Sequence, residues 1–197
     1  MNLRRMLIAA MAGLVGCGAT SVAMAAPASK GKSSTSEARP AATGSVVGAE
    51  PTLIGQFGTW GAYMAAPNGK KVCFVLAKPS SSKTTPAGRP RDPAYAFIST
   101  RPAEKVVNEV SVMIGYPLKP GSESTMEVGG ASFAMYTQGD GIWIKNAAEE
   151  DRLVEALRKA PEVTVKGVSA KGTATTDVFS LKGLAQALDK VAQNCGG

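Results

Sequence analysis

The sequence contains no histidine among its 197 residues, and only 6% of its residues are aromatic. Without an imidazole, the chain has no histidine-containing metal site, no Ser-His-Asp or Cys-His catalytic arrangement and no imidazole proton relay. It also lacks an apolar run of about 20 residues, the length that a helix needs to cross a bilayer. These absences exclude a polytopic membrane protein and histidine-dependent hydrolases. We expect a non-enzymatic protein that needs no metal and no cofactor.

Apolar residues make up 44% of the chain, enough to bury the core of about one domain. The first residues have the pattern of an export signal, since Arg4 and Arg5 precede an apolar run over residues 6–16. Two processing sites compete. Ala23-Met24-Ala25 fits the general signal peptidase, whereas Leu14-Val15-Gly16-Cys17 is similar to a lipobox, which would lipidate Cys17.

We therefore expect a signal peptide over residues 1–25, with a lipoprotein signal that ends before Cys17 as the alternative. Residues 26–50 are rich in Ala, Ser, Thr, Gly, Pro and Lys and contain no aromatic residue, which predicts a disordered linker. Residues 51–197 form the expected globular domain. The mature protein would have no transmembrane span. We expect it in the periplasm, at the outer membrane or cell surface, or secreted.

Three cysteines are present. Cys17 is removed or acylated under either processing scheme, which leaves Cys73 and Cys195. An even pair of cysteines in an oxidising compartment predicts a disulfide. The alternative is two buried, unpaired thiols.

Short apolar runs separated by Gly and Pro turns predict about eight strands between residues 53 and 179, the first of them over residues 53–64, with a polar loop over residues 80–93. A helix is expected to begin with Asn146 as N-cap and Glu149 in the capping-box position, and to end before Pro161. A second helix, over residues 181–194, has an amphipathic stripe that includes Cys195. The fold class is α+β, mostly antiparallel sheet or sandwich with two helices, one of them C-terminal.

Aromatic residues are too few to spare for the surface of a domain of this size. We expect them to fill the core rather than to form a sugar-stacking platform. The set comprises Phe57, Trp60, Tyr63, Tyr95, Phe133 and Trp143.

Several motifs occur together in one order along the chain. Phe57-Gly58-x-Trp60 precedes Gly115-Tyr116-Pro117, and residues 165–183 read V-x-G-x-S-x-K-G-T-x-T-x-D-x-F-S-L-x-G ahead of Cys195. This pattern resembles the invasion-associated locus B (IalB) family of exported alphaproteobacterial proteins. It departs from the family at Lys171, where we expect Arg, and at Phe179, where we expect Tyr. The resemblance implies an exported envelope or surface protein linked to host-cell interaction, and it supplies no catalytic residue.

The positive charge is concentrated in one region. Residues 70–105 contain eight basic and two acidic residues, whereas residues 106–197 contain nine basic and eleven acidic residues. Such a patch favours anionic partners, either glycans or lipids of the envelope or host surface. The simpler interpretation is a solvated loop, and export disfavours nucleic acid as a partner. The candidate binding residues are Lys70, Lys71, Lys78, Lys83, Arg89 and Arg91.

Three weaker patterns are best explained by structural roles rather than by catalysis or ligand binding. Residues 167–172 have the spacing of a phosphate loop but lack its lysine, so a hairpin turn is expected. Ser80-x-x-Lys83 lies in a polar stretch too irregular to hold a Ser-Lys dyad. The polar set Arg101, Glu109, Thr173, Thr175 and Asp177 is expected to make structural hydrogen bonds and an Arg–carboxylate pair.

The leading interpretation is a binding module of the cell envelope. The alternative is a periplasmic structural or assembly factor that acts through a protein partner.

Overall fold

The computed structural model describes residues 50–196. The expected signal peptide, Cys17 and nearly all of the expected linker lie outside these residues. The described chain forms one eleven-stranded antiparallel sheet with the strand order β1-β2-β3-β5-β6-β9-β8-β7-β10-β11-β4. The strands are β1 (Thr52–Phe57), β2 (Trp60–Ala65), β3 (Val72–Ala77), β4 (Ser81–Thr85), β5 (Tyr95–Arg101), β6 (Val106–Met113), β7 (Ser124–Val128), β8 (Ala131–Gln138), β9 (Gly141–Ile144), β10 (Glu162–Val168) and β11 (Ala174–Ser180).

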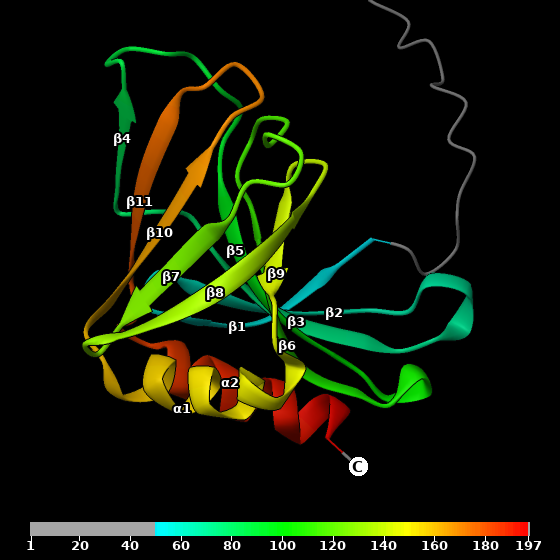
Figure 1. Cartoon of the computed structure of the whole chain (residues 1–197). Helices are drawn as coiled ribbons and strands as arrows, with labels where there is room; N and C mark the ends of the chain where they lie inside the picture. The colour runs from blue at the N-terminus through cyan, green and yellow to red at the C-terminus, as the bar shows by residue number, and fades with distance from the viewer. Residues whose placement is uncertain (1–49, 197) are drawn as a thin grey trace, which may run out of the picture. The chain divides into compact units, whose positions relative to one another are not determined.

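The two helices are α1 (Glu150–Lys159) and α2 (Leu184–Cys195). They lie next to each other on one face of the sheet, where α2 contacts β1, β2, β3 and β5 and α1 contacts β6 and β7 (Figure 1). The α+β class with a C-terminal helix is therefore confirmed, although the sheet has more strands than expected. Between residues 50 and 196, no helix combines the length and the apolar character needed to cross a bilayer.

The sheet curves around a single core, which forms where alternate residues of its strands point inward. In β3, Cys73, Val75 and Ala77 are buried while the residues between them are half-buried. Long-range contacts close the curve. Trp60 on β2 donates through Nε1 to the carbonyl of Ser180 at the end of β11, at 2.9 Å. This hydrogen bond ties β11, in the second half of the strand order, to β2, in the first half.

Helix α1 begins later than its sequence suggested. The Asn146 side chain accepts a hydrogen bond from the backbone N–H of Ala148, but it caps a single 3-10 turn over Ala147–Glu149. The α-helix then starts at Glu150 without a side-chain cap, so the expected capping box is wrong. Helix α2 likewise starts at Leu184 rather than Leu181.

The start of α2 is set by a close approach of two backbones. Gly183 has a φ of +93°, and a Cβ at this position would collide with the carbonyl oxygen of Phe57. Gly58 mirrors it, because a Cβ there would collide with the carbonyl oxygen of Lys182. Only glycine at both positions lets the β1–β2 turn rest against the first residues before the helix.

The predicted disulfide is confirmed. Cys73 on β3 and Cys195 in the last turn of α2 are bonded, with their Cα atoms 5.9 Å apart. Both residues belong to the core, since Cys73 has no exposed surface and Cys195 is 5% exposed. The bridge ties the C-terminal helix to the third strand of the sheet.

Two predicted elements differ from the structure. The single strand expected over residues 53–64 is a hairpin of β1 and β2 that turns at Gly58-Thr59. The loop expected over residues 80–93 contains β4, an edge strand whose five residues pair with β11. All the residues of β4 are polar, so it has no apolar alternation by which the sequence would reveal it. Its pairing depends on backbone hydrogen bonds.

Glu150 couples the start of α1 to β6 and predicts a pH dependence of stability. Its Oε1 accepts a hydrogen bond from Val110 N–H at 2.8 Å. Burial raises the pKa of the Glu150 carboxyl above its usual 4.5, and Glu109 and Asp151 add to this effect, whereas the Val110 N–H and Arg101 oppose it. The folded state therefore binds this proton more tightly than the unfolded state. The resulting stabilisation is present below pH 4.5 and is lost as the pH rises through the folded pKa.

In the Glu150→Gln variant the side chain cannot ionise, but its amide oxygen can still accept the hydrogen bond from the Val110 N–H. We expect it to be slightly more stable than the parent protein at pH 7, with the difference vanishing near pH 3.5. Urea unfolding at the two pH values measures this. A variant less stable than the parent at pH 7 would show that the charged form is the favoured one.

Candidate functional site

A cleft of about 500 Å³ lies where three segments far apart in the sequence meet. Its walls come from the loop after β4, from the turn after β6 and from the β10–β11 turn. Backbone hydrogen bonds hold these walls together, with Asp92 N–H donating to Gly115 O at 3.0 Å and Ala170 N–H donating to Pro117 O at 2.9 Å. The lining residues are Thr84, Pro86, Arg89, Pro90, Arg91, Tyr116, Pro117, Ser169, Ala170, Lys171, Gly172, Thr173 and Thr175.

Arg91 is the structural centre of the cleft. Its guanidinium pairs with both carboxylate oxygens of Asp177, whose side chain has no exposed surface. It also donates to Ile114 O at 2.9 Å and to Ser82 Oγ at 3.0 Å. A bidentate Arg–carboxylate pair fixes geometry and cancels charge. Arg91 therefore joins β4, β6 and β11, and its charge is already matched by a protein carboxylate.

Tyr116 forms the floor next to this pair. Its hydroxyl lies 2.6 Å from Oγ1 of Thr175, which is buried on β11. Burial raises the pKa of the Tyr116 hydroxyl, an effect that the hydrogen bond with Thr175 partly offsets. The ring also faces the Arg91 guanidinium, 6.0 Å from its centroid. Tyr116 thus remains a neutral phenol with an apolar ring exposed to the cleft.

Two exposed cations border the cleft without such a matched carboxylate. Arg89 lies on the loop after β4, where its backbone N–H donates to Thr84 Oγ1 at 3.3 Å. Lys171 lies in the β10–β11 turn, and both side chains are exposed. Neither takes part in an ion pair among residues 50–196. A cleft lined by Tyr116 and three prolines, with two exposed positive charges among its lining residues, suits an anionic group attached to an apolar or ring-shaped body.

The candidate basic residues do not form one surface. Arg89 and Arg91 line the cleft, and Lys83 is exposed on the adjoining edge strand β4. Lys70 and Lys71 follow the short helix η1 (Pro67–Gly69), where the Lys71 ammonium donates to Asn194 O at the end of α2, at 3.1 Å. Lys78 lies at the end of β3, with its ammonium 5.5 Å from the centre of the Tyr95 ring. The sequence patterns place Lys171 in a hairpin turn and at a departure from the family pattern, and they predict no binding role for it. The glycine-bounded turn over residues 167–172 is the signal that marks its position.

The expected structural role of the polar set agrees with the contacts. Asp177 holds Arg91, and Arg101 bridges Glu109 at 2.7 Å and Glu104 at 2.7 Å. The bond to Glu109, followed by that to Glu104, raises the pKa of Arg101 despite its partial burial, so it stays charged. Ser80 donates to Val178 O at 3.0 Å, which gives it a structural hydrogen bond at the start of β4.

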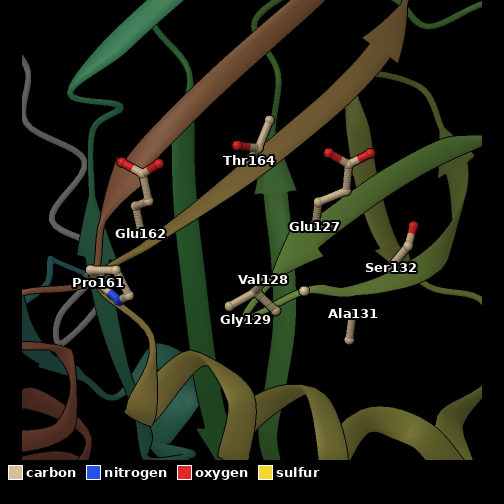
Figure 2. A pocket seen from close by; sticks show the side chains of 9 residues that line it. Glu127, Val128, Gly129, Ala131, Ser132, Pro161, Glu162 and Thr164 are labelled. Carbon is tan, nitrogen blue, oxygen red and sulfur yellow. The ribbon is translucent and has the colours of Figure 1, made fainter.

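A second, shallower depression of about 440 Å³ lies over β7 and β10. Glu127 and Glu162 point to the same side there, with Thr164 between them (Figure 2). Glu127 is bound by the Lys166 ammonium at 2.7 Å. One of the two carboxylates is thus already engaged by a lysine, and the residues that line the depression include no cation.

The expected aromatic core is only partly correct. Trp60 and Phe133 are buried in the core, being 2% and 1% exposed, and Phe57 packs against it. Tyr63, Tyr95 and Trp143 instead lie on the outer face of the sheet, opposite the helices, and are half-buried. On the strands that carry these three rings, small and branched side chains such as Ala62, Ala96 and Ile142 face the interior instead.

Comparison with known proteins gives one result. The sequence profile of the family described as "Invasion associated locus B (IalB) protein" matches residues 60–192, from the first residue of β2 into the last turns of α2. No curated protein and no solved structure matches the chain. The family match spans most of the chain and nearly all of the described sheet. The chain therefore belongs to the invasion-associated locus B family, a family of exported bacterial proteins.

Proposed function

We propose that this protein is a non-enzymatic binding module of the cell envelope that takes an anionic ligand in the cleft beside Arg91. The observation that supports this most directly is that one of the three cations at the cleft has a carboxylate partner and the other two do not. Arg91 is paired with Asp177, whereas Arg89 and Lys171 are exposed and line the same cleft as Tyr116. Two unpaired charges at one cleft bind a phosphorylated or carboxylated headgroup better than a diffuse patch would.

The electrostatic part of this binding is testable with phosphate-bearing membranes. Vesicles of phosphatidylcholine with phosphatidylglycerol serve as the anionic probe, and pure phosphatidylcholine vesicles serve as the neutral one. We expect binding to the anionic vesicles alone. Binding should weaken steeply between 0.05 and 0.5 M salt, since the Debye length falls from above about 10 Å to below it.

Arg89→Glu combined with Lys171→Glu is expected to lower the affinity for the anionic vesicles by about tenfold or more, a loss of about 1.4 kcal/mol. The matched control is Lys70→Glu combined with Lys182→Glu, which makes the same change in net charge at exposed positions outside the cleft. Cosedimentation measures both. Equal losses in the two variants, or no binding at low salt, would contradict the proposal.

The alternative is a periplasmic structural or assembly factor that acts through a protein partner. One feature favours it: the described sheet is open and ends in two edge strands, β1 and β4. An exposed edge can add a strand from another chain through backbone hydrogen bonds. Such a complex would be insensitive to salt and to the Arg89 and Lys171 substitutions. Cross-linking in cells followed by pull-down at high salt distinguishes the two functions.

A further inference from the structure

Aromatic residues form a continuous row on the outer face of the sheet. Six of the eleven aromatic residues of the chain lie there, although a protein with so few would be expected to bury them. The row crosses consecutive strands of the sheet from β2 to β8. Its aromatic members are Tyr63, Phe74, Phe97, Tyr95, Trp143 and Tyr136, and we call it the aromatic ladder.

Each step of the ladder is a contact or a register pair. Tyr63 and Phe74 stack with centroids 5.3 Å apart, and Phe74 is followed by Phe97 at 6.1 Å. Phe97 contacts Tyr95 at 6.3 Å, and Tyr95 pairs with Met113 of β6. Met113 pairs in turn with Gly141 of β9, over which the Trp143 ring lies, and Trp143 and Tyr136 stack at 5.6 Å. With neighbouring strands about 4.8 Å apart, five steps from β2 to β8 give a ladder of roughly 24 Å.

Two of the rings are laid against the sheet by glycines. A Cβ added to Gly61 would lie 2.6 Å from Cε2 of Tyr63, two residues later on the same strand. A Cβ added to Gly141 would lie 2.5 Å from Cζ3 of Trp143 and 3.1 Å from Cε of Met113. Both rings therefore occupy the space above a glycine. This packing fixes the positions of the two rings in advance of binding, and both rings stay partly exposed.

Polar residues border the middle of the ladder, while Leu53 adjoins Tyr63 and Leu76 adjoins Phe97. Ser99 and Glu109 lie along one side, where they pair with each other across β5 and β6. Lys78 and Gln138 lie along the other side, and both are exposed. A stable protein interface buries about 800 Å² on each partner around an apolar centre. A row of rings that runs across the strands and is bordered by polar residues at its middle suits a single elongated chain better than a second folded protein.

One free charge accompanies the ladder. The Lys78 ammonium lies 5.5 Å from the centre of the Tyr95 ring and has no carboxylate partner among residues 50–196. Arg101 and Lys145 already have carboxylate partners, since Arg101 pairs with Glu104 and Glu109 and Lys145 pairs with Glu123. The uncompensated charge next to the Tyr95 ring is therefore positive, whereas the Arg101 cluster has one carboxylate more than it has cations.

We propose that the aromatic ladder binds a linear acidic polysaccharide, whose sugar rings stack on Trp143 and Tyr63 while a carboxylate meets Lys78. Sugar rings carry polarised C–H groups on one face, and these are attracted to the negative face of an aromatic ring. Their hydroxyl groups project sideways, toward the polar borders of the ladder. This site is separate from the cleft and does not depend on the function proposed for it.

The test uses two β-linked hexasaccharides, acidic hyaluronan and neutral chitohexaose, measured by titration calorimetry. We expect both to bind, with hyaluronan tighter. Trp143→Ala should weaken both by about tenfold or more, the loss expected for a central aromatic anchor, while Trp143→Phe retains most of the affinity. Lys78→Ala should remove the advantage of hyaluronan and leave chitohexaose unchanged. Binding of chitohexaose should persist in 0.5 M salt, unlike binding in the cleft.

A second variant separates ring position from ring identity. Gly141→Ala keeps Trp143 but displaces its ring, so it should lose binding as Trp143→Ala does. Val107→Ala is the matched control, because Val107 is 65% exposed on β6 outside the ladder. Circular dichroism and thermal unfolding verify that each variant folds.

Three results would overturn the proposal. The first is that neither hexasaccharide binds the parent protein. The second is that Trp143→Ala and Gly141→Ala bind like Val107→Ala. The third is loss of sugar binding in the Arg89→Glu/Lys171→Glu variant, which would move the site to the cleft. If no sugar binds and Trp143→Ala abolishes a concentration-dependent dimer in analytical ultracentrifugation, the ladder is an interface between two copies of the chain.

Discussion

Replacing Cys73 and Cys195 together by alanine is expected to lower the free energy of unfolding by about 4.7 kcal/mol, the chain-entropy value for a loop of about 100 residues. The bridge joins residues 122 positions apart, so all of the described domain except β1, β2 and the chain up to Cys73 lies within the loop that it closes. Without the bridge, the unfolded chain gains the conformations that this loop forbids. A domain whose total stability is on the order of 5–15 kcal/mol would lose a large share of it.

Urea unfolding of the double variant measures this loss. Because β3 and α2 would then be joined by packing alone, amide hydrogen exchange of α2 should accelerate more than that of β7 or β10. Val107→Ala is a suitable reference, since it removes an exposed apolar side chain without touching the bridge. A loss below about 1 kcal/mol, within the range of an ordinary substitution, would mean that the core residues of α2 already hold the helix in place.

Asp177→Asn is expected to cost about 3–5 kcal/mol, because it leaves the Arg91 guanidinium buried without its carboxylate. Asp177 has no exposed surface and the Arg91 side chain is 11% exposed, so water cannot replace the lost partner. Asparagine has nearly the same shape as aspartate. The loss of stability would therefore come from the missing negative charge of Asp177 and not from a change in side-chain volume.

Two comparisons make this prediction specific. Lys159→Gln breaks the exposed pair with Glu155 on α1 and should change stability by less than about 0.5 kcal/mol. The double variant Arg91→Met with Asp177→Leu removes both charges and should recover much of the loss, since a buried pair can be exchanged for apolar side chains at little cost. If Asp177→Asn is as mild as Lys159→Gln, the Arg91–Asp177 pair does not hold the cleft together.

The two proposed binding sites lie on different parts of the sheet and would bind their ligands through different kinds of interaction. The cleft beside Arg91 is assembled from three loops, and its free charges make it sensitive to salt. The aromatic ladder lies on regular strands and depends on ring geometry set by Gly61 and Gly141. Substitutions in one site should leave the other intact.

Local patterns predicted much of this fold because they depend on neighbouring residues alone. Alternating apolar residues marked most of the strands, and Pro161 marked the end of α1. The cysteine pair was predictable from the residue count and the expected compartment. The strand β4 was not predictable, since its polar side chains carry no alternation and its partner β11 lies about 90 residues further along the chain.

The sequence by itself determined the α+β class, the two helices and the pairing of Cys73 with Cys195. The tertiary structure alone decided which side of each strand faces the core. In β5, alternation separates Tyr95, Phe97 and Ser99 from Ala96, Ile98 and Thr100, but a period of two residues does not say which set is covered. The smaller set lies inside because α2 packs on that face, and the rings were left on the outer face for the same reason.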